Sequence, residues 1–205
     1  MTVVRKTYAP PEPNMKEVYR YMGVKGEPDE ATKQLADEAV GRIKSSSMCR
    51  VCYTRLPIER PDSKTLVIGS IRTESVFLAG NLADCSEVYL FMATIGGSAD
   101  RLIASSRMYP SKALALDAAA SALTEALCNK LNAELKEQAA AEGKFLRPRY
   151  SAGFGDFTLE YQKYFVDILN SPKNIGVALR NGTMMFPTKS VSALIGISDK
   201  ERKQQ

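Results

Sequence analysis

The segment from Pro110 to about residue 141 constrains the fold more than any other part of the chain, because it predicts one long helix. A proline at the first position of a helix loses no hydrogen bond, so Pro110 suits its start. One apolar stripe recurs at helical spacing and consists of Leu116, Ala120, Leu123 and Leu127. We expect this stripe to lie against a sheet.

Nearly opposite that stripe the same helix carries small residues around one carboxylate. They are Ala118, Ser121, Ala122 and Glu125. Small side chains let another helix or a ligand approach the backbone closely, and a plain solvent-facing alanine surface has the same composition. The residues alone leave these alternatives open.

The expected partner of the long helix is a sheet. Residues 87–95 (EVYLFMATI) are strongly apolar and predict its central strand. Further strands are expected over residues 49–58, 65–71, 175–179, 183–186 and 191–197, with a short helix or connection at 82–86 and a helix at 99–108. This order of elements predicts an α+β fold with a mainly antiparallel twisted sheet and flanking helices.

The N-terminal part reads as helical after a loose start. Three prolines within residues 1–13 predict a flexible arm. Asn14 can cap a short helix over 15–21, and Pro28 or Asp29 can begin a second one. We expect one domain over residues 14–198, with a helical subregion at 14–48 and a charged tail at 199–205.

Composition excludes several kinds of chemistry. The chain has no histidine, so it cannot form a Ser-His or Cys-His nucleophile or a histidine metal site. Its net charge of +5 is too mild to argue for nucleic acid. No apolar run is long enough for a membrane span or a signal peptide, and we therefore expect a cytoplasmic protein.

Two short motifs carry little functional information. Cys49 and Cys52 form a C-x-x-C pair inside an expected strand, where a spacing of three places them on opposite faces. That is poor geometry for one metal ion. Gly96 and Gly97 link a strand to a helix and could cradle an anion, but they match neither common phosphate-binding fingerprint, and a tight turn is favoured.

A stronger candidate site lies after the long helix. Arg147 and Arg149 precede Phe154, which is bracketed by Gly153 and Gly155. Guanidinium groups grip carboxylates or phosphates, glycines let the backbone approach a ligand, and an aromatic ring offers a flat face. The alternative is a surface arginine beside an ordinary loop. Asp156 or Thr158 is expected to cap the helix that follows.

Four segments resemble the activation domain of vitamin B12-dependent methionine synthase, in the same order and spacing. They are Arg149-x-x-x-Gly153-Phe154, Ile175-Gly176-x-x-Leu179, Met185-Phe186-Pro187-x-x-Ser190-Val191-Ser192, and Glu125 on the long helix. The similarity extends over about residues 111–198 and is weak before them. The whole chain is more similar to free-standing versions of this domain than to the end of a large synthase.

The resemblance implies binding of S-adenosylmethionine. Arg149 would hold its carboxylate, the backbone from Ser151 to Gly153 would contact it, Phe154 would pack on it, and Glu125 would place negative charge near its sulfonium or amino group. No catalytic side chain and no bound metal are implied. The chain would act as an accessory subunit in reductive methylation of an inactive Co(II) corrinoid.

The cobalamin would belong to a partner, because the corrinoid-binding motif Asp-x-His-x-x-Gly is missing from a chain without histidine. The resemblance implies a cobalamin-dependent methionine synthase or another corrinoid protein as that partner. Flavodoxin or ferredoxin are candidate electron donors, and neither nucleic acid nor a membrane is an expected partner.

The sequence also departs from the family pattern. Phe154 replaces a tyrosine, Ile195-Gly196 replaces an aromatic pair, and the N-terminal Asp-Trp-x-Pro motif is missing. The Ile195-Gly196 departure favours an alternative, a docking module for a corrinoid protein that does not bind S-adenosylmethionine. Retention of Arg149, Gly153 and Glu125 favours ligand binding. An ordinary methyltransferase is weakly supported, because no glycine fingerprint follows an early strand.

Overall fold

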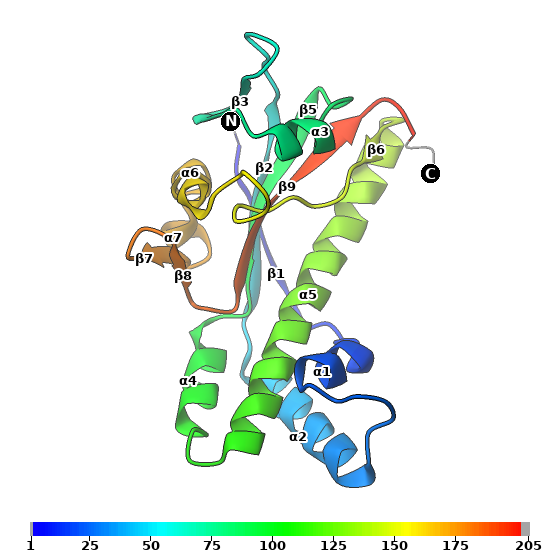
Figure 1. The fold of residues 1–205 in the computed structure, drawn as a ribbon, viewed down its shortest axis with the longest axis vertical. Helices are drawn as coiled ribbons and strands as arrows, with labels where there is room; N and C mark the ends of the chain where they lie inside the picture. The colour runs from blue at the N-terminus through cyan, green and yellow to red at the C-terminus, as the bar shows by residue number, and fades with distance from the viewer. Residues whose placement is uncertain (1, 202–205) are drawn as a thin grey trace.

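A five-stranded antiparallel sheet forms the centre of the computed structural model, which describes residues 2–201 (Figure 1). Its strands, in spatial order, are β1 (Val4–Tyr8), β2 (Cys49–Pro57), β5 (Glu87–Thr94), β9 (Ser190–Ser198) and β6 (Phe145–Leu146). β5 lies in the middle and all but its first residue are buried, as predicted. The predicted α+β class with an antiparallel sheet is confirmed. Met1 and, of the expected charged tail, residues 202–205 lie outside the described part of the chain.

The predicted long helix is α5 (Pro110–Ala141), and it runs along one face of the sheet (Figure 1). Leu116, Leu123 and Leu127 are buried in one core with Phe91 of β5 and Ile195 of β9. The apolar stripe therefore meets the sheet, as expected. The helix α4 (Gly97–Ser105) precedes α5 and packs beside it.

Two N-terminal helices pack against α5. They are α1 (Met15–Tyr21) and α2 (Glu30–Ser46), and Asn14 and Asp29 cap them by accepting hydrogen bonds from Lys16 N–H and Thr32 N–H. Ala118 and Ala122 of α5 are buried against Val18 and Ala36. The small-residue face could have met a helix, a ligand or solvent, and for these two alanines it meets other helices.

The second face of the sheet is covered by short elements. These are α3 (Val76–Asn81), the 3-10 turn η1 (Leu159–Tyr161), α6 (Gln162–Leu169), α7 (Ser171–Asn174), the hairpin β3 (Leu66–Ile68) with β4 (Ile71–Thr73), and the hairpin β7 (Ala178–Arg180) with β8 (Met184–Phe186). Phe157 and Phe165 are buried in this second core together with Leu90 of β5 and Leu194 of β9. Residues 82–86, expected as a short helix or a connection, are a connection that follows α3. The strand expected over 65–71 is a hairpin instead, because Gly69 turns the chain with a φ of 58°.

The prediction of a flexible arm at residues 1–13 is wrong for the part that forms a strand. Residues Val4–Tyr8 form the edge strand β1, in antiparallel register with β2 from Val4↔Tyr53 to Tyr8↔Cys49. Lys6 Nζ and Tyr8 OH also donate to Glu134 of α5, at 2.7 and 2.8 Å. The prolines that suggested an arm all follow this strand, so they do not interrupt its pairing.

Cys49 and Cys52 lie on opposite faces of β2, as predicted, because each belongs to a different core. Burial raises the pKa of Cys49 to about 11 and that of Cys52 to about 12. Both thiols are therefore protonated near neutral pH and neither is a reactive thiolate. Within residues 2–201, no helix combines the length and apolar character that crossing a bilayer requires.

Candidate functional site

Arg149 and Glu125, two of the residues predicted for the site, are in contact. Arg149 Nη2 donates to Glu125 Oε2 at 2.9 Å and to Asn129 Oδ1 at 3.1 Å. Glu125 and Asn129 are four residues apart, so they lie on the same side of α5. Among residues 2–201, Arg149 Nε and Nη1 have no hydrogen-bond acceptor, so the guanidinium retains donors for a ligand.

The guanidinium of Arg147, in contrast, is not available to a ligand. Its side chain is 3% exposed and pairs with Asp84, and its Nη2 donates to the carbonyl of Lys200 at 2.6 Å. Of the two arginines that the sequence placed before the glycine-bracketed phenylalanine, only Arg149 faces an accessible surface. Arg147 holds three chain segments together.

The loop after β6 presents Phe154 to solvent. Gly153 and Gly155 adopt φ values of 98° and 55°, which favour glycine. Gly153 N–H donates to Phe157 O at 2.7 Å, and Phe154 N–H donates to Ser151 O at 3.3 Å. These bonds close a tight turn that leaves the Phe154 side chain 63% exposed.

The same bonds define which backbone groups of this loop remain free. Gly153 N–H and Ser151 C=O, both within the expected ligand-contacting segment, already have partners in the loop. Within the described chain, the N–H and the hydroxyl of Ser151 have none. Ser151 therefore offers two donors beside Arg149.

Of the two residues expected to cap the next helix, Thr158 occupies the N-cap position of η1, without a side-chain hydrogen bond, and Asp156 does not. The Asp156 carboxylate instead accepts from Val76 N–H at 2.7 Å and from the hydroxyl of Ser75, the N-cap residue of α3, so it supports the start of α3. These hydrogen bonds hold the pKa of Asp156 below its usual range. Since the Phe77 ring lies against Gly155, α3 and the glycine loop form one surface.

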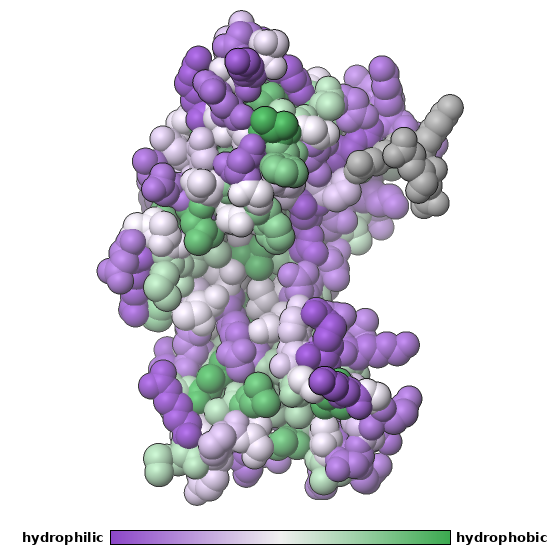
Figure 2. Space-filling view, viewed as in Figure 1, coloured by the Kyte–Doolittle hydropathy of each residue, from purple (hydrophilic) through white to green (hydrophobic). Residues whose placement is uncertain are grey.

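That surface is apolar. Val76 is 75% exposed and Phe77 is 64% exposed, beside the exposed Phe154. Figure 2 shows hydrophobic residues gathered over α3 and the loop after β6. Exposed apolar surface of this kind marks contact sites for ligands or partner proteins.

The edge of β9 is open next to this loop. Tyr150 and Leu194 exchange both backbone hydrogen bonds, at 2.9 and 2.8 Å, and the strand β6 pairs only beyond that point. Backbone groups two residues apart on an antiparallel strand point to the same side, so the N–H and C=O of Ser192 point the same way as those of Leu194. No described segment pairs with the Ser192 groups there. We call this region, formed by Glu125, Asn129, Arg149, Ser151 and the Ser192 backbone, the open-edge site.

Sequence reasoning singled out Ser121 and Glu125 but missed that they belong to a longer polar row on α5, which borders the open-edge site. Asp117, Ser121, Glu125 and Asn129 follow one another at intervals of four residues. Lys189, just before β9, donates to Ser121 Oγ and pairs with Asp117, both at 2.9 Å. The four-residue spacing was the signal that could have found this row.

The Ile195-Gly196 departure has a structural counterpart. Ile195 is buried against α5, and a Cβ at Gly196 would lie 2.5 Å from Cys85 Sγ and 2.7 Å from Leu82 Cδ2. An aromatic side chain at residue 196 does not fit beside these atoms. Any ligand at the open-edge site is therefore bound without the aromatic pair of the family pattern.

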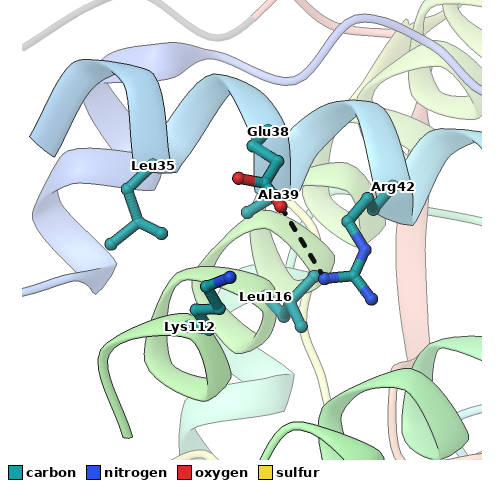
Figure 3. Close-up of a pocket in the computed structure, with 6 residues that line it drawn as sticks. All are labelled: Leu35, Glu38, Ala39, Arg42, Lys112 and Leu116. Carbon is teal, nitrogen blue, oxygen red and sulfur yellow. Dashed lines mark ion pairs between the residues drawn. The ribbon is translucent and has the colours of Figure 1, made fainter. Parts of the chain in front are cut away.

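A small pocket lies elsewhere, between α2 and α5 (Figure 3). It has a cavity volume of about 10 Å³ and is lined by Leu35, Glu38, Ala39, Arg42, Lys112 and Leu116. Ligand pockets usually measure about 300–1,000 Å³. None of the predicted site residues lines this pocket. Within residues 2–201, no group of three or more histidine, cysteine, aspartate or glutamate residues is placed to hold a metal ion.

The chain is similar to a solved structure, although no protein-family model and no curated protein matches it. That structure is the MetH reactivation domain bound to AdoHcy, with a TM-score of 0.74 and 14% sequence identity. The match covers 100% of this chain and 81% of that chain. The resemblance inferred from four short motifs is therefore confirmed at the level of the fold.

Proposed function

We propose that this chain binds S-adenosylmethionine at the open-edge site and serves as a separate reactivation subunit for a cobalamin-dependent methionine synthase. The observation that carries the proposal is the contact between Arg149 and Glu125 beside an unpaired strand edge. It occurs in a fold that matches the MetH reactivation domain bound to AdoHcy, which is S-adenosylmethionine without its transferable methyl group.

The open-edge site suits a ligand with a carboxylate and a positive charge. Arg149 has unused donors for the carboxylate, and Glu125 has a second carboxylate oxygen for an ammonium or sulfonium group. Ser151 adds an N–H and a hydroxyl, and Phe154 offers an exposed ring for packing. Charged hydrogen bonds of this kind contribute about 1.5–3 kcal/mol each.

Positioning is the main task that the side chains would perform. When bound, S-adenosylmethionine supplies a methyl group that its sulfonium already activates, and the corrinoid of the partner supplies the nucleophile. A chain without histidine suits this role, because no general base is required. Correct orientation alone can account for about 7–11 kcal/mol of a barrier in favourable cases.

The partner would contact the apolar surface next to the open-edge site. Val76, Phe77 and Phe154 are exposed there, and a methyl group can be transferred only if the acceptor reaches the ligand. A flavodoxin or ferredoxin would supply the electron. Four free cysteines are compatible with the reducing cytoplasm, where we place this activity.

Calorimetric titration with S-adenosylmethionine tests the proposal. We expect saturable binding by the wild type and a loss of about 1.5–3 kcal/mol in Arg149→Ala. Arg72→Ala is the matched control, since Arg72 is an exposed arginine on β4 that makes no ion pair among the described residues. Equal binding by wild type and Arg149→Ala would contradict the assignment.

The second candidate is a docking module that does not bind S-adenosylmethionine. The packing at Gly196 favours it, because the aromatic ligand contacts of the family have no room there. Titration separates the two candidates. Absence of binding by the wild type, both alone and with a cobalamin-dependent methionine synthase that lacks this domain, would leave the docking role.

A further inference from the structure

Arginine side chains withdrawn from solvent are paired in this protein, with one exception. The four that are not exposed within residues 2–201 are Arg50, Arg55, Arg147 and Arg149. Arg55 pairs with Glu87, Arg147 with Asp84, and Arg149 with Glu125. Arg50 pairs with no described carboxylate or other acceptor, and its Nε is buried without a partner.

Arg50 lies on the face of the sheet opposite α5. Its neighbours on β2, Cys49 and Val51, point into the core beneath α5, so the alternation of the strand directs Arg50 to the other face. The residues beside it on β1 and β5 are Thr7 and Thr94, which carry no charge. The open-edge site packs against α5, so Arg50 is separate from it.

The guanidinium of Arg50 meets the turn at Gly176. A Cβ at this glycine would lie 3.4 Å from Arg50 Nη2 and 3.8 Å from Nη1. Gly176 is exposed and has a φ of 74°, so its backbone favours glycine and no side chain covers the guanidinium there. The two terminal nitrogens therefore lie close to the surface, whereas Nε lies beneath it.

The chain around this turn carries no negative charge. From Ile168 to Ser198 there is no aspartate or glutamate, while Lys173 and Arg180 add positive charge. On β1, Arg5 belongs to the same face of the sheet as Arg50, two residues from Thr7. An anion approaching Arg50 would meet an attractive field.

A half-buried guanidinium without an acceptor is unfavourable, since its desolvation is not offset by hydrogen bonds. An oxyanion offsets it best, because two oxygens can accept parallel N–H groups. We propose that Arg50 and the Gly176 turn form a binding site for the carboxylate or phosphate group of a small anionic ligand. This site is additional to the proposed S-adenosylmethionine site and does not depend on it.

Titrations with inorganic phosphate and with acetate test this site, at constant ionic strength set by chloride. Binding is followed by the midpoint of thermal unfolding and by backbone amide NMR shifts near Gly176. We expect one of the anions to bind saturably to the wild type. Binding should weaken at least tenfold in Arg50→Met, recover in part in Arg50→Lys, and stay unchanged in Arg72→Met.

The two anions distinguish the ligand class. Saturation by phosphate alone assigns a phosphate group, and saturation by acetate assigns a carboxylate. The proposal is overturned if neither anion saturates, or if Arg50→Met binds as the wild type does.

A measurement without anions provides an independent test. Because Arg50 has no partner to lose, Arg50→Met should unfold at or above the temperature of the wild type in a phosphate-free and carboxylate-free buffer. Arg147→Met, which removes a paired arginine, should unfold below it. If Arg50→Met unfolds as low as Arg147→Met or fails to fold, Arg50 is structural and the proposal is wrong.

Discussion

Arg147 Nε donates to Asp84 Oδ1 at 2.9 Å, and this pair joins the chain after β6 to the segment that precedes β5. The arginine side chain is 3% exposed, whereas that of Asp84 is 37% exposed. The carbonyl of Lys200 accepts from the same guanidinium, so the chain after β9 is held as well. Arg147 is therefore a structural residue that stands two positions from the proposed ligand-binding arginine.

This pair should make stability depend on pH in the acid range. Arg147 lowers the pKa of Asp84 from 3.8 to about 2. Since the folded-state pKa is depressed, the pair stabilises the fold fully above pH 3.8, and that contribution is lost as the pH falls toward 2. The free energy of unfolding in urea should be lower for Asp84→Asn than for the wild type by about 2 kcal/mol at pH 7. Solvent screening of the partly exposed carboxylate keeps this difference modest. The two free energies should converge near pH 2.

Asp37→Asn is the control for that series, because Asp37 is an exposed carboxylate of α2 without an ion pair in the described chain. It should change stability little at any pH. A difference between wild type and Asp84→Asn that stays constant from pH 7 to 2 would show that charge pairing is not its cause.

Helix packing on α5 should be sensitive to added volume at Ala122. This alanine is buried against α1 and α2, so Ala122→Leu should force them away and cost about 1–3 kcal/mol. Ala140→Leu makes the same change at an exposed position of the same helix and should be nearly neutral. Equal stability of the two variants in urea unfolding would mean that the small-residue face is not closely packed.

Local sequence signals were sufficient for much of this fold. The apolar spacing of α5, the apolar run of β5 and the capping residues Asn14 and Asp29 each act within a few residues, so each predicted its element. The strand β1 was missed because its partner β2 lies far along the chain, and short strands depend on such pairing.

At the candidate site, too, contacts between residues distant in sequence were not predicted from local patterns. Only the family resemblance placed Arg149 and Glu125 at one site, and it did not predict their direct contact. No local pattern links a loop to a helix that ends before it. Asp156 was one of two candidates for capping the following helix, but its carboxylate accepts from Val76 N–H at the start of α3, 80 residues away in sequence. Sequence proximity did not indicate which helix this carboxylate would reach.

Gly153 and Gly143 offer a matched test of the tight loop. Both have positive φ values, 98° and 71°, so alanine is strained at either position, at about 1 kcal/mol or more. Only at Gly153 would the new Cβ also lie 2.8 Å from Leu159 Cδ2, whereas at Gly143 it meets nothing within 4 Å. We expect Gly153→Ala to be the more destabilised variant in thermal unfolding, and equal losses would contradict close packing of the loop.

Deletion of residues 1–8 tests the corrected N-terminus. If β1 pairs as described, the deletion exposes the edge of β2 and removes the Lys6 and Tyr8 hydrogen bonds to Glu134, at a cost of about 3 kcal/mol or more. A double variant, Lys6→Met with Tyr8→Phe, keeps the strand, removes only the side-chain bonds and should lose less. Urea unfolding of both proteins measures the difference. An unchanged free energy of unfolding after the deletion would support the flexible arm first expected for this segment.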